Sequence, residues 1–497
     1  MGLLKRIAGV WNEYKRDKIG MVGLGLLVLF LFVAVAFPVI GNEEVIENWD
    51  NYQYFRFYPK NAPPCWASII TGEKYTRTII ADGKAVEVIR DTGVDEQRNL
   101  PYVNVTIKVP VDVTGTAPPN DVLLVMDLRY NSSRYPVYVT GLSVVRPDGE
   151  VFYFVPPGKK VPINSILVGL PARKVNATDL VLSFKSLTEN QFLVQRFIIP
   201  ELRNMGIQVS VVDIANIMLT IFDAVFSKDI VAAFKGNATE AQEGRYWWVL
   251  QLYGYNASIN VAPKRLVVMG ACYGVLGTDN QGRDLWQGVL YGVRWALIVG
   301  LLASTLSVLI GSLYGIVSGY FGGVVDEVMM RVAQIIYSLP ALPILILLAA
   351  LYKPTIWLIV FMIVAFGWPG VAIVTRSMAL QVRQEPYVES AIALGASTKR
   401  ILFLYIMPQV LPYMFATIAL SVPGAIIAEA SLSFLGVGDP SVLTWGRILH
   451  EAETANAALN GYWWWVLPPG LGIALVGLSF VFIGNALDRI LNPRLRR

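Results

Sequence analysis

Six long apolar runs without a charged residue constrain this chain more than any other feature. Each reaches the roughly 20 residues that an α-helix needs to cross the hydrocarbon core of a bilayer. Apolar segments in the core of a globular protein are shorter and periodic. The sequence therefore predicts an all-α polytopic membrane protein with six transmembrane helices. The predicted spans are residues 19–40, 295–319, 332–352, 354–375, 406–428 and 463–487.

The first run needs a separate argument, because a secretory signal also begins with charges and continues with an apolar stretch. Charged residues precede it in the segment 1–18, and Ala34-Val35-Ala36 resembles a signal-peptidase site. The run is nevertheless longer than the about 7–15 apolar residues of a cleaved signal. A retained anchor is therefore favoured over cleavage.

Lysine and arginine gather on one side of the predicted membrane. With residues 1–18 inside, the two short outer loops carry only Lys353 and Arg447. The positive-inside bias then places both termini in the cytoplasm, residues from about 41 to 294 outside and the loop 376–405 inside. The net charge of +5 follows this topology, and no basic run with interleaved aromatic residues points to nucleic acid.

Residues 41–275 read as a soluble, β-rich extracytoplasmic domain inserted between the first two spans. Alternating apolar residues predict strands, Pro147-Asp148-Gly149 predicts a hairpin turn, and two longer segments predict helices. A sandwich-like core with a helical elaboration is expected. The predicted strands are 102–113, 122–128, 138–145, 151–155, 247–255 and 265–269, and the predicted helical segments are 189–204 and 211–234.

All N-x-S/T sequons of the chain fall within this domain. They begin at Asn104, Asn131, Asn176, Asn237 and Asn256. N-glycosylation on the outer face agrees with the charge-derived topology. The alternative is chance in a segment rich in asparagine and threonine.

The two cysteines of the chain, Cys65 and Cys272, stand at the two ends of the inserted domain. On an oxidising side of the membrane they would form a disulfide that closes the domain at its neck. Two separate free thiols are the alternative. No metal site is expected, because a zinc site needs three or four Cys or His ligands and His450 is the only histidine.

The loop 385–408, between the fourth and fifth spans, carries the most informative motif. An amphipathic helix is predicted after Pro386, with small residues that allow another protein surface to approach closely and with Gly395 at its end. Pro408 then directs the chain back into the membrane. An ordinary amphipathic connector is the alternative that the residues alone leave open.

The spacing in this loop resembles the EAA loop of ABC-importer permeases. Glu389-Ser390-Ala391, then Gly395 and Pro408, follow the family pattern, with Ser390, Tyr405 and Met407 as mild departures. The surrounding residues look most like the dipeptide/oligopeptide branch, and specifically its C-type subunit. Two further stretches are similar to that branch: 276–284, with Gly277, Asp279, Gly282, Arg283 and Asp284, and 428–438 with Trp445-Gly446-Arg447.

The resemblance covers residues 1–65 and 272–497, so residues 276–497 are expected to form a permease core of the type I ABC-importer fold, interrupted by the outer domain. It implies that the EAA loop docks on a cytoplasmic ATPase and transmits its motion. The residues expected to make or shape that contact are Tyr387, Glu389, Ser390, Ala391, Leu394, Gly395 and Pro408.

The resemblance also implies partners: a second, different permease subunit, two cytoplasmic ATPase subunits and an extracytoplasmic substrate-binding protein. The sequence has no Gly-x-x-x-x-Gly-Lys-Ser/Thr loop. The chain is therefore not expected to be an enzyme or to hold a cofactor, and ATP and Mg²⁺ are expected on the partner ATPases.

Candidates for the translocation path are Ser421, Glu429 and Ser431. An ionisable group at membrane depth is a functional candidate, although a helix-end carboxylate at the water-facing interface is the alternative for Glu429. Asp279, Arg283 and Asp284 are interpreted as a structural ion-pair cluster in preference to a substrate contact.

Other functions are weighed against the importer. An intramembrane enzyme would need clustered acids or metal ligands at the membrane face, and a secondary transporter would need carboxylates inside its spans. An importer of the same architecture for oligosaccharides remains an alternative to one for di- or oligopeptides. For the inserted domain, docking of the binding protein is favoured over an envelope anchor or a fused substrate receptor.

Overall fold

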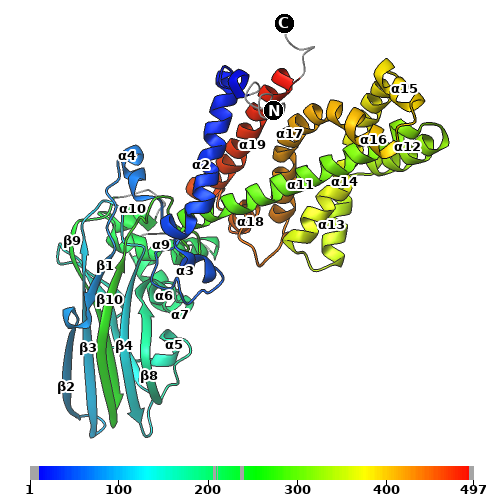
Figure 1. Ribbon diagram of the computed structural model, residues 1–497. Helices are drawn as coiled ribbons and strands as arrows, with labels where there is room; N and C mark the ends of the chain where they lie inside the picture. The colour runs from blue at the N-terminus through cyan, green and yellow to red at the C-terminus, as the bar shows by residue number, and fades with distance from the viewer. Residues whose placement is uncertain (1–10, 205–206, 208, 210, 235–239, 492–497) are drawn as a thin grey trace. The chain divides into compact units, whose positions relative to one another are not determined.

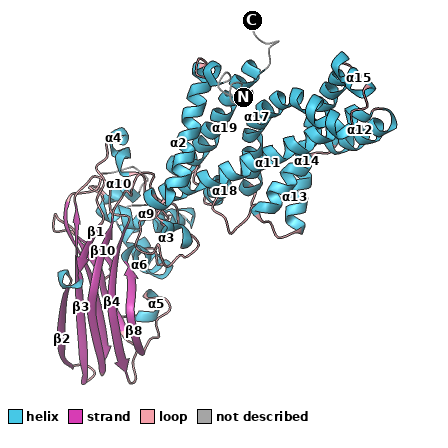
Figure 2. Cartoon of the chain, viewed as in Figure 1, coloured by secondary structure: helices cyan, strands magenta, loops and turns pink. Residues whose placement is uncertain are grey.

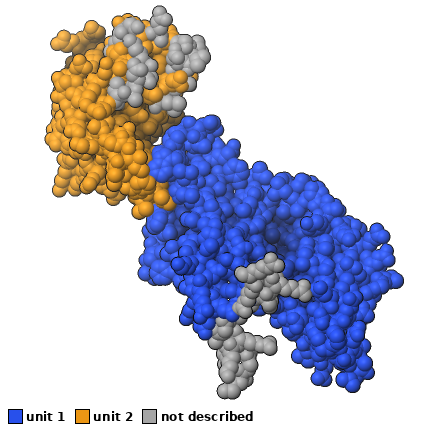
Figure 3. Space-filling view, turned by 90° about the horizontal axis from the view of Figure 1, so that it is seen from above, with its two compact units in different colours: residues 1–50, 285–497 blue, residues 51–284 orange. Residues whose placement is uncertain are grey.

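The structure is a computed structural model that describes residues 11–204, 207, 209, 211–234 and 240–491. Its contacts divide the chain into two compact units. One unit combines Met1–Asp50 with Leu285–Arg497, and the other is Asn51–Asp284 (Figure 3).

The first unit is built from long apolar helices. Among the described residues, five helices are long and apolar enough to cross a membrane, and a bent pair of helices would make a sixth span. The long helices are α2 (Lys18–Ile40), α11 (Leu285–Phe321), α14 (Ile356–Arg383), α17 (Met407–Phe434) and α19 (Trp463–Leu491), and the bent pair is α12 (Gly323–Ser338) with α13 (Ala341–Leu351).

The predicted span 332–352 is not one continuous helix, because the chain bends by 78° between α12 and α13. The bend falls at Leu339 and Pro340, and Leu339 has an extended backbone with φ −71° and ψ 138°. A proline removes a helical N–H donor and disfavours helical geometry in the residue before it. Pro369 and Pro423, in contrast, lie inside the continuous helices α14 and α17.

A row of glycines brings α11 and α14 into close contact. A Cβ atom would lie 2.4 Å from the carbonyl oxygen of Trp368 at Gly311, and 2.3 Å from that of Ala372 at Gly315. Residues four apart share one face of a helix, so this face of α11 presents bare backbone to α14. Small residues at such spacing are typical of closely packed membrane helices, where dispersion forces drive association.

The second unit contains two antiparallel sheets (Figures 1 and 2). The four-stranded sheet has the order β1 (Ile79–Asp82), β10 (Ala257–Met269), β4 (Asp121–Ser132) and β8 (Lys174–Ser183). The six-stranded sheet has the path β2 (Glu87–Asp95), β3 (Leu100–Val113), β9 (Gly244–Tyr255), β5 (Tyr138–Val145) and β6 (Val151–Val155), and β7 (Val161–Pro162) pairs with β5.

Side chains from both sheets form one hydrophobic core, which includes Ile107 of β3 and Leu124 of β4. Helices complete that core: Phe222 of α9 (Val211–Phe226) stacks on Trp248 of β9 with ring centroids 5.8 Å apart. Further helices of this part include α5 (Ile163–Ile166), α6 (Phe184–Thr188), α7 (Gln191–Leu193), the π-helix η3 (Val194–Ile198), α8 (Ile199–Asn204) and α10 (Ile230–Phe234).

The predicted strand-rich insert is therefore present, and it has strands that the sequence patterns missed. Strand β2 is exposed along most of its length, so it lacks the alternation of apolar and polar residues on which the prediction relied. Strand β1 is largely exposed as well, and β8 has only two buried residues, Val175 and Leu182. Edge strands bury less surface than central ones, and their sequence signal is correspondingly weak.

Candidate functional site

A short helix, α15 (Pro386–Ala393), occupies the loop between α14 and α17. Pro386 stands in its first turn, where a missing N–H costs nothing. The helix ends at Gly395, which has φ +80°, and the N–H of Ala396 bonds to the carbonyl of Ala391 at 3.0 Å. This is a left-handed glycine cap that satisfies the last carbonyls of the helix.

One face of α15 packs on the chain itself. Val388 is fully buried and Ala391 is 8% exposed. Val388 belongs to a hydrophobic cluster with Ile401 and Ile406, and Ala396 packs on the edge of that cluster. Ala391, one of the predicted coupling residues, therefore faces its own domain, and its small side chain lets α15 lie closely on that domain.

Away from these buried residues, α15 and its C-cap residue expose apolar side chains to solvent. Leu394 is 87% exposed, Tyr387 44% and Ile392 41%. Glu389 and Ser390 are exposed on the same helix, and the Ser390 hydroxyl donates to the Pro386 carbonyl at 2.7 Å. We call Tyr387, Ile392 and Leu394 the outer face of α15. Ile392 was not among the predicted contact residues, although it is an apolar residue of the same helix.

From Thr398 onward the chain continues without a break in helical structure. The helix α16 (Thr398–Ile401) runs into a π-helical turn, η4 (Leu402–Ile406), and then into α17. Pro408 is exposed in the first turn of α17. Tyr405 of the π-turn stacks on Tyr387 with ring centroids 6.3 Å apart, so it supports one member of the outer face.

The predicted outer motif lies at the neck of the inserted domain, where it contacts residues from the other end of the insert. The buried Thr278 hydroxyl accepts from the N–H of Ala62 at 3.0 Å and donates to the carbonyl of Pro59 at 2.7 Å. The N–H of Asn61 bonds to the carbonyl of Asp279 at 2.7 Å. These bonds join segments that are more than 200 residues apart in the sequence.

An ion pair between Asp279 and Arg283 organises the same motif. Both side chains are buried, and the Asp279 carboxylate also accepts from the N–H groups of Gln281 and Arg283. Burial raises the pKa of the Asp279 carboxyl, and the Arg283 guanidinium opposes that rise. Gly277 and Gly282 have positive φ values, and a Cβ atom at Gly282 would lie 3.0 Å from the carbonyl oxygen of Tyr58. The buried ion pair and these close backbone contacts are typical of a cluster that stabilises the fold.

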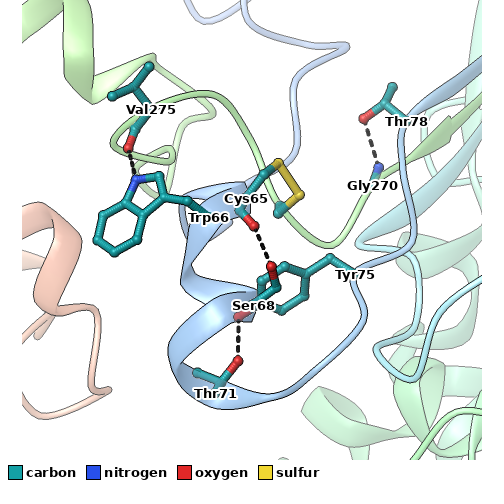
Figure 4. Close-up of a disulfide and its surroundings, with 9 residues drawn as sticks. Cys65, Trp66, Ser68, Thr71, Tyr75, Thr78, Gly270 and Val275 are labelled. Carbon is teal, nitrogen blue, oxygen red and sulfur yellow. Dashed lines mark hydrogen bonds between the residues drawn. A yellow bond between two sulfur atoms is a disulfide. The ribbon is translucent and has the colours of Figure 1, made fainter.

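The predicted disulfide between Cys65 and Cys272 is present and lies beside this motif (Figure 4). The N–H of Tyr273 bonds to the carbonyl of Pro63 at 2.9 Å, so hydrogen bonds flank the bridge. The short helices η1 (Cys65–Ala67) and α4 (Ser68–Thr71) follow Cys65 directly. Covalent and hydrogen bonds thus close the insert at its base.

Glu429, a predicted path residue, is buried where α17 meets α18 (Trp445–Thr454). It is 4% exposed and accepts a hydrogen bond from Ser433 at 2.7 Å and another from Thr444, the N-cap residue of α18. This carboxylate therefore joins two helices of the chain. Ser421 and Ser431 are half-buried, and the Ser431 hydroxyl is bonded to the carbonyl of Ile427.

Three of the predicted glycosylation sites, Asn131, Asn176 and Asn256, are exposed. Asn104 is half-buried on β3, and Asn237 lies outside the described residues.

Apolar helices joined by glycine contacts, with a projecting half-apolar helix in one loop, define a polytopic membrane permease. The chain belongs to the family described as binding-protein-dependent transport system inner membrane component, which matches residues 311–497. The N-terminal transmembrane domain of oligopeptide transport permease C matches residues 6–64. Together these matches leave out most of the inserted domain.

Curated relatives agree with this assignment. The dipeptide transport system permease protein DppC of Bacillus subtilis is 37% identical over 222 residues, which cover 44% of this chain and 69% of the relative. The oligopeptide transport system permease protein OppC of the same organism is 36% identical, covering 44% and 72%. OppC of Haemophilus influenzae is 36% identical, covering 45% and 71%.

Proposed function

We propose that this chain is the C-type permease subunit of an ATP-driven importer of di- or oligopeptides and forms half of its translocation channel. The outer face of α15 carries the proposal. The helix is fixed to its own domain by the buried Val388, while Leu394 is 87% exposed. Leu394 is therefore an apolar side chain that a partner protein can bury, and we call it the apolar knob. The names of the relatives favour peptides over the oligosaccharide alternative.

The partner of this knob is a cytoplasmic ATPase. Two such subunits, a second and different permease and a substrate-binding protein on the other side complete the transporter. ATP and Mg²⁺ are bound by the ATPases, and this chain contributes no catalytic group. Closure of the ATPase pair moves α15, and the helices packed against it change which side of the membrane the channel faces.

The orientation follows from the charge pattern. The loop that holds α15 also holds the exposed Lys399 and Arg400, which belong on the cytoplasmic side under the positive-inside rule. Both termini then lie in the cytoplasm and residues from about 41 to 294 lie outside. The exposed sequons at Asn131, Asn176 and Asn256 are accessible to glycosylation there, and the outer domain is a docking surface for the binding protein. Ser421, Glu429 and Ser431 are the candidates for the translocation path.

Leu394 provides the sharpest test of the ATPase contact. Replacing Leu394 with Asp puts a charge at the centre of the apolar knob and should abolish copurification of the ATPase, while Leu394→Met keeps the apolar contact and should retain it. The measurement is the ATPase recovered with the tagged permease in detergent. Equal recovery with both variants would remove α15 from the interface.

The substrate is tested separately with the reconstituted complete complex. Dipeptides and longer peptides should stimulate ATP hydrolysis in the presence of the binding protein, whereas oligosaccharides should not. Stimulation by oligosaccharides alone would overturn the peptide assignment and leave the coupling role of α15 intact.

A further inference from the structure

A small group of apolar side chains projects from the neck of the inserted domain. We call residues 65–75, which contain η1 and α4, the neck loop. Within it Ile69 is 84% exposed, Ile70 73% and Trp66 39%, and the neighbouring Val275 is 48% exposed. Burying such side chains is worth about 1.5–3 kcal/mol each, so leaving them in water is costly.

The structure holds these side chains outward. Cys65 is bonded to Cys272, the Trp66 indole N–H donates to the Val275 carbonyl at 2.6 Å, and the Ser68 hydroxyl donates to the Cys65 carbonyl at 2.9 Å (Figure 4). Ala67, between the exposed residues, is buried. Where the loop ends, the N–H of Lys74 bonds to the Thr116 hydroxyl at 3.0 Å. The exposed side chains of Trp66, Ile69 and Ile70 therefore belong to a loop that a disulfide and hydrogen bonds hold in place.

We propose that the neck loop is an interfacial membrane anchor, in which Ile69, Ile70 and Trp66 enter the boundary between headgroups and acyl chains. Chain length allows this. Val275 precedes Leu285, the first residue of α11, by ten positions, which span at most about 36 Å. The chain therefore lets the loop reach no farther than this from the start of α11, whichever way the domain is turned.

The charges around the loop fit a lipid surface. A hollow of about 770 Å³ lies beside the disulfide, and its lining includes Lys74, Tyr75 and Arg77, with Glu73 as its only acidic residue. Lys74 and Arg77 are exposed. Segments that lie in the membrane interface typically combine basic residues with tryptophan and exposed aliphatic side chains. In such segments the basic residues contact lipid phosphates.

A soluble protein partner fits the same surface less well. A stable protein interface buries about 800 Å² on each side, whereas the apolar part of the neck loop consists of Trp66, Ile69 and Ile70 together with Val275. Penetration by roughly 5–10 Å into the headgroup region is enough to cover side chains of this length. The inference depends only on the chain being a membrane protein, and it is independent of the proposed peptide import.

The test uses the full-length protein in lipid nanodiscs. Both native cysteines are in the disulfide, so Ile69→Cys or Ile70→Cys can be labelled selectively with an environment-sensitive fluorophore. We expect a blue-shifted emission and strong quenching by lipids that carry a spin label near the headgroup end of the acyl chain. Anionic lipid should strengthen the quenching, and the Lys74→Ala/Arg77→Ala variant should lose that dependence.

Val168→Cys is the matched control. Val168 is 83% exposed in the loop after α5, and Figure 1 shows α5 at the other end of the domain from α4. Its label should be quenched by iodide in the aqueous phase and not by the spin-labelled lipid. The proposal is overturned if the labels at positions 69 and 70 behave like the label at 168. It is also overturned if they become shielded only when the binding protein is added.

Discussion

Arg376 of α14 forms two hydrogen bonds with Asp326 of α12. Its Nε and Nη2 atoms donate to the two carboxylate oxygens, each at 2.5 Å, and the Ser318 hydroxyl of α11 donates to the same carboxylate. Three helices therefore meet at one charge pair. The pair lies next to the glycine contacts, because Gly319 of α11 packs against the backbone of Arg376.

Removing one partner of this pair should destabilise the helix bundle. Arg376→Gln leaves the Asp326 charge without its counter-ion. Because the Arg376 side chain is 34% exposed, the cost should fall below the about 3–5 kcal/mol of a fully buried pair. The double variant Asp326→Asn/Arg376→Gln removes both charges and should be less destabilised than the single variant. Thermal unfolding in detergent measures both. Additive effects would show that the two residues do not act as a pair.

The neck of the insert should depend on the Thr278 hydroxyl. Thr278→Val keeps the shape of the side chain but leaves the buried N–H of Ala62 without its acceptor, at a cost of about 1–3 kcal/mol. Thr278→Ser retains the hydroxyl and is the control. Denaturant unfolding of the insert, followed by tryptophan fluorescence, compares the two. Equal midpoints for the two variants would contradict the importance of the bond.

The disulfide should contribute more than any single hydrogen bond of the neck. It connects residues 207 positions apart, and in the chain-entropy view closing a loop of that length is worth about 5 kcal/mol. Reduction, or the Cys65→Ser/Cys272→Ser variant, should lower the unfolding temperature of the insert. The apolar helices should unfold as before, since their unit does not contain the bridge. An insert insensitive to reduction would argue against the bridge.

Substitutions of Gly395 should affect coupling according to how well the new residue adopts a positive φ. At φ +80° a β-branched residue is strained by about 1–2 kcal/mol, although nothing crowds the position. Gly395→Val should therefore shift the end of α15 and uncouple ATP hydrolysis from uptake in the reconstituted complex. Gly395→Asn tolerates the left-handed region and should keep most of the coupling. Normal uptake by the valine variant would count against the loop's role.

The insert should be stabilised by acid through Asp121. Burial raises the pKa of this carboxyl, while the Ser183 hydroxyl and the Lys185 N–H donate to it and oppose the rise. A raised folded pKa gives a contribution that is complete below the unfolded pKa of about 3.9 and is lost as pH rises through the folded value. A pKa difference of one corresponds to about 1.4 kcal/mol.

The comparison that isolates this effect is between the parent and Asp121→Asn. The pKa values of Asp95 and Asp127 are lowered, chiefly by hydrogen bonds from Tyr255 and Lys264, so those groups act in the opposite sense in both proteins. The unfolding midpoint of the insert, measured from about pH 4 to pH 7, should fall less steeply in the asparagine variant. Identical slopes would exclude Asp121 as the source.

The sequence by itself determined the apolar spans, the strand-rich insert and the amphipathic loop at 385–408. These signals are local, because length without charge, alternation and a glycine after a helical pattern each need only neighbouring residues. The bend at Pro340 is also a local effect of proline. Pro369 and Pro423 nevertheless lie inside continuous helices, and no local rule predicts which of these prolines interrupts a helix.

Only the tertiary structure decided which side chains face inward. Ala391 and Leu394 lie three positions apart in one motif, but one is buried on its own domain and the other is almost fully exposed. Glu429 is buried by α18, and Thr278 meets Ala62 across 216 positions. The physical reason is common to all three. The environment of each side chain is set by elements that are distant in the sequence. The local sequence pattern therefore does not predict whether the side chain is buried.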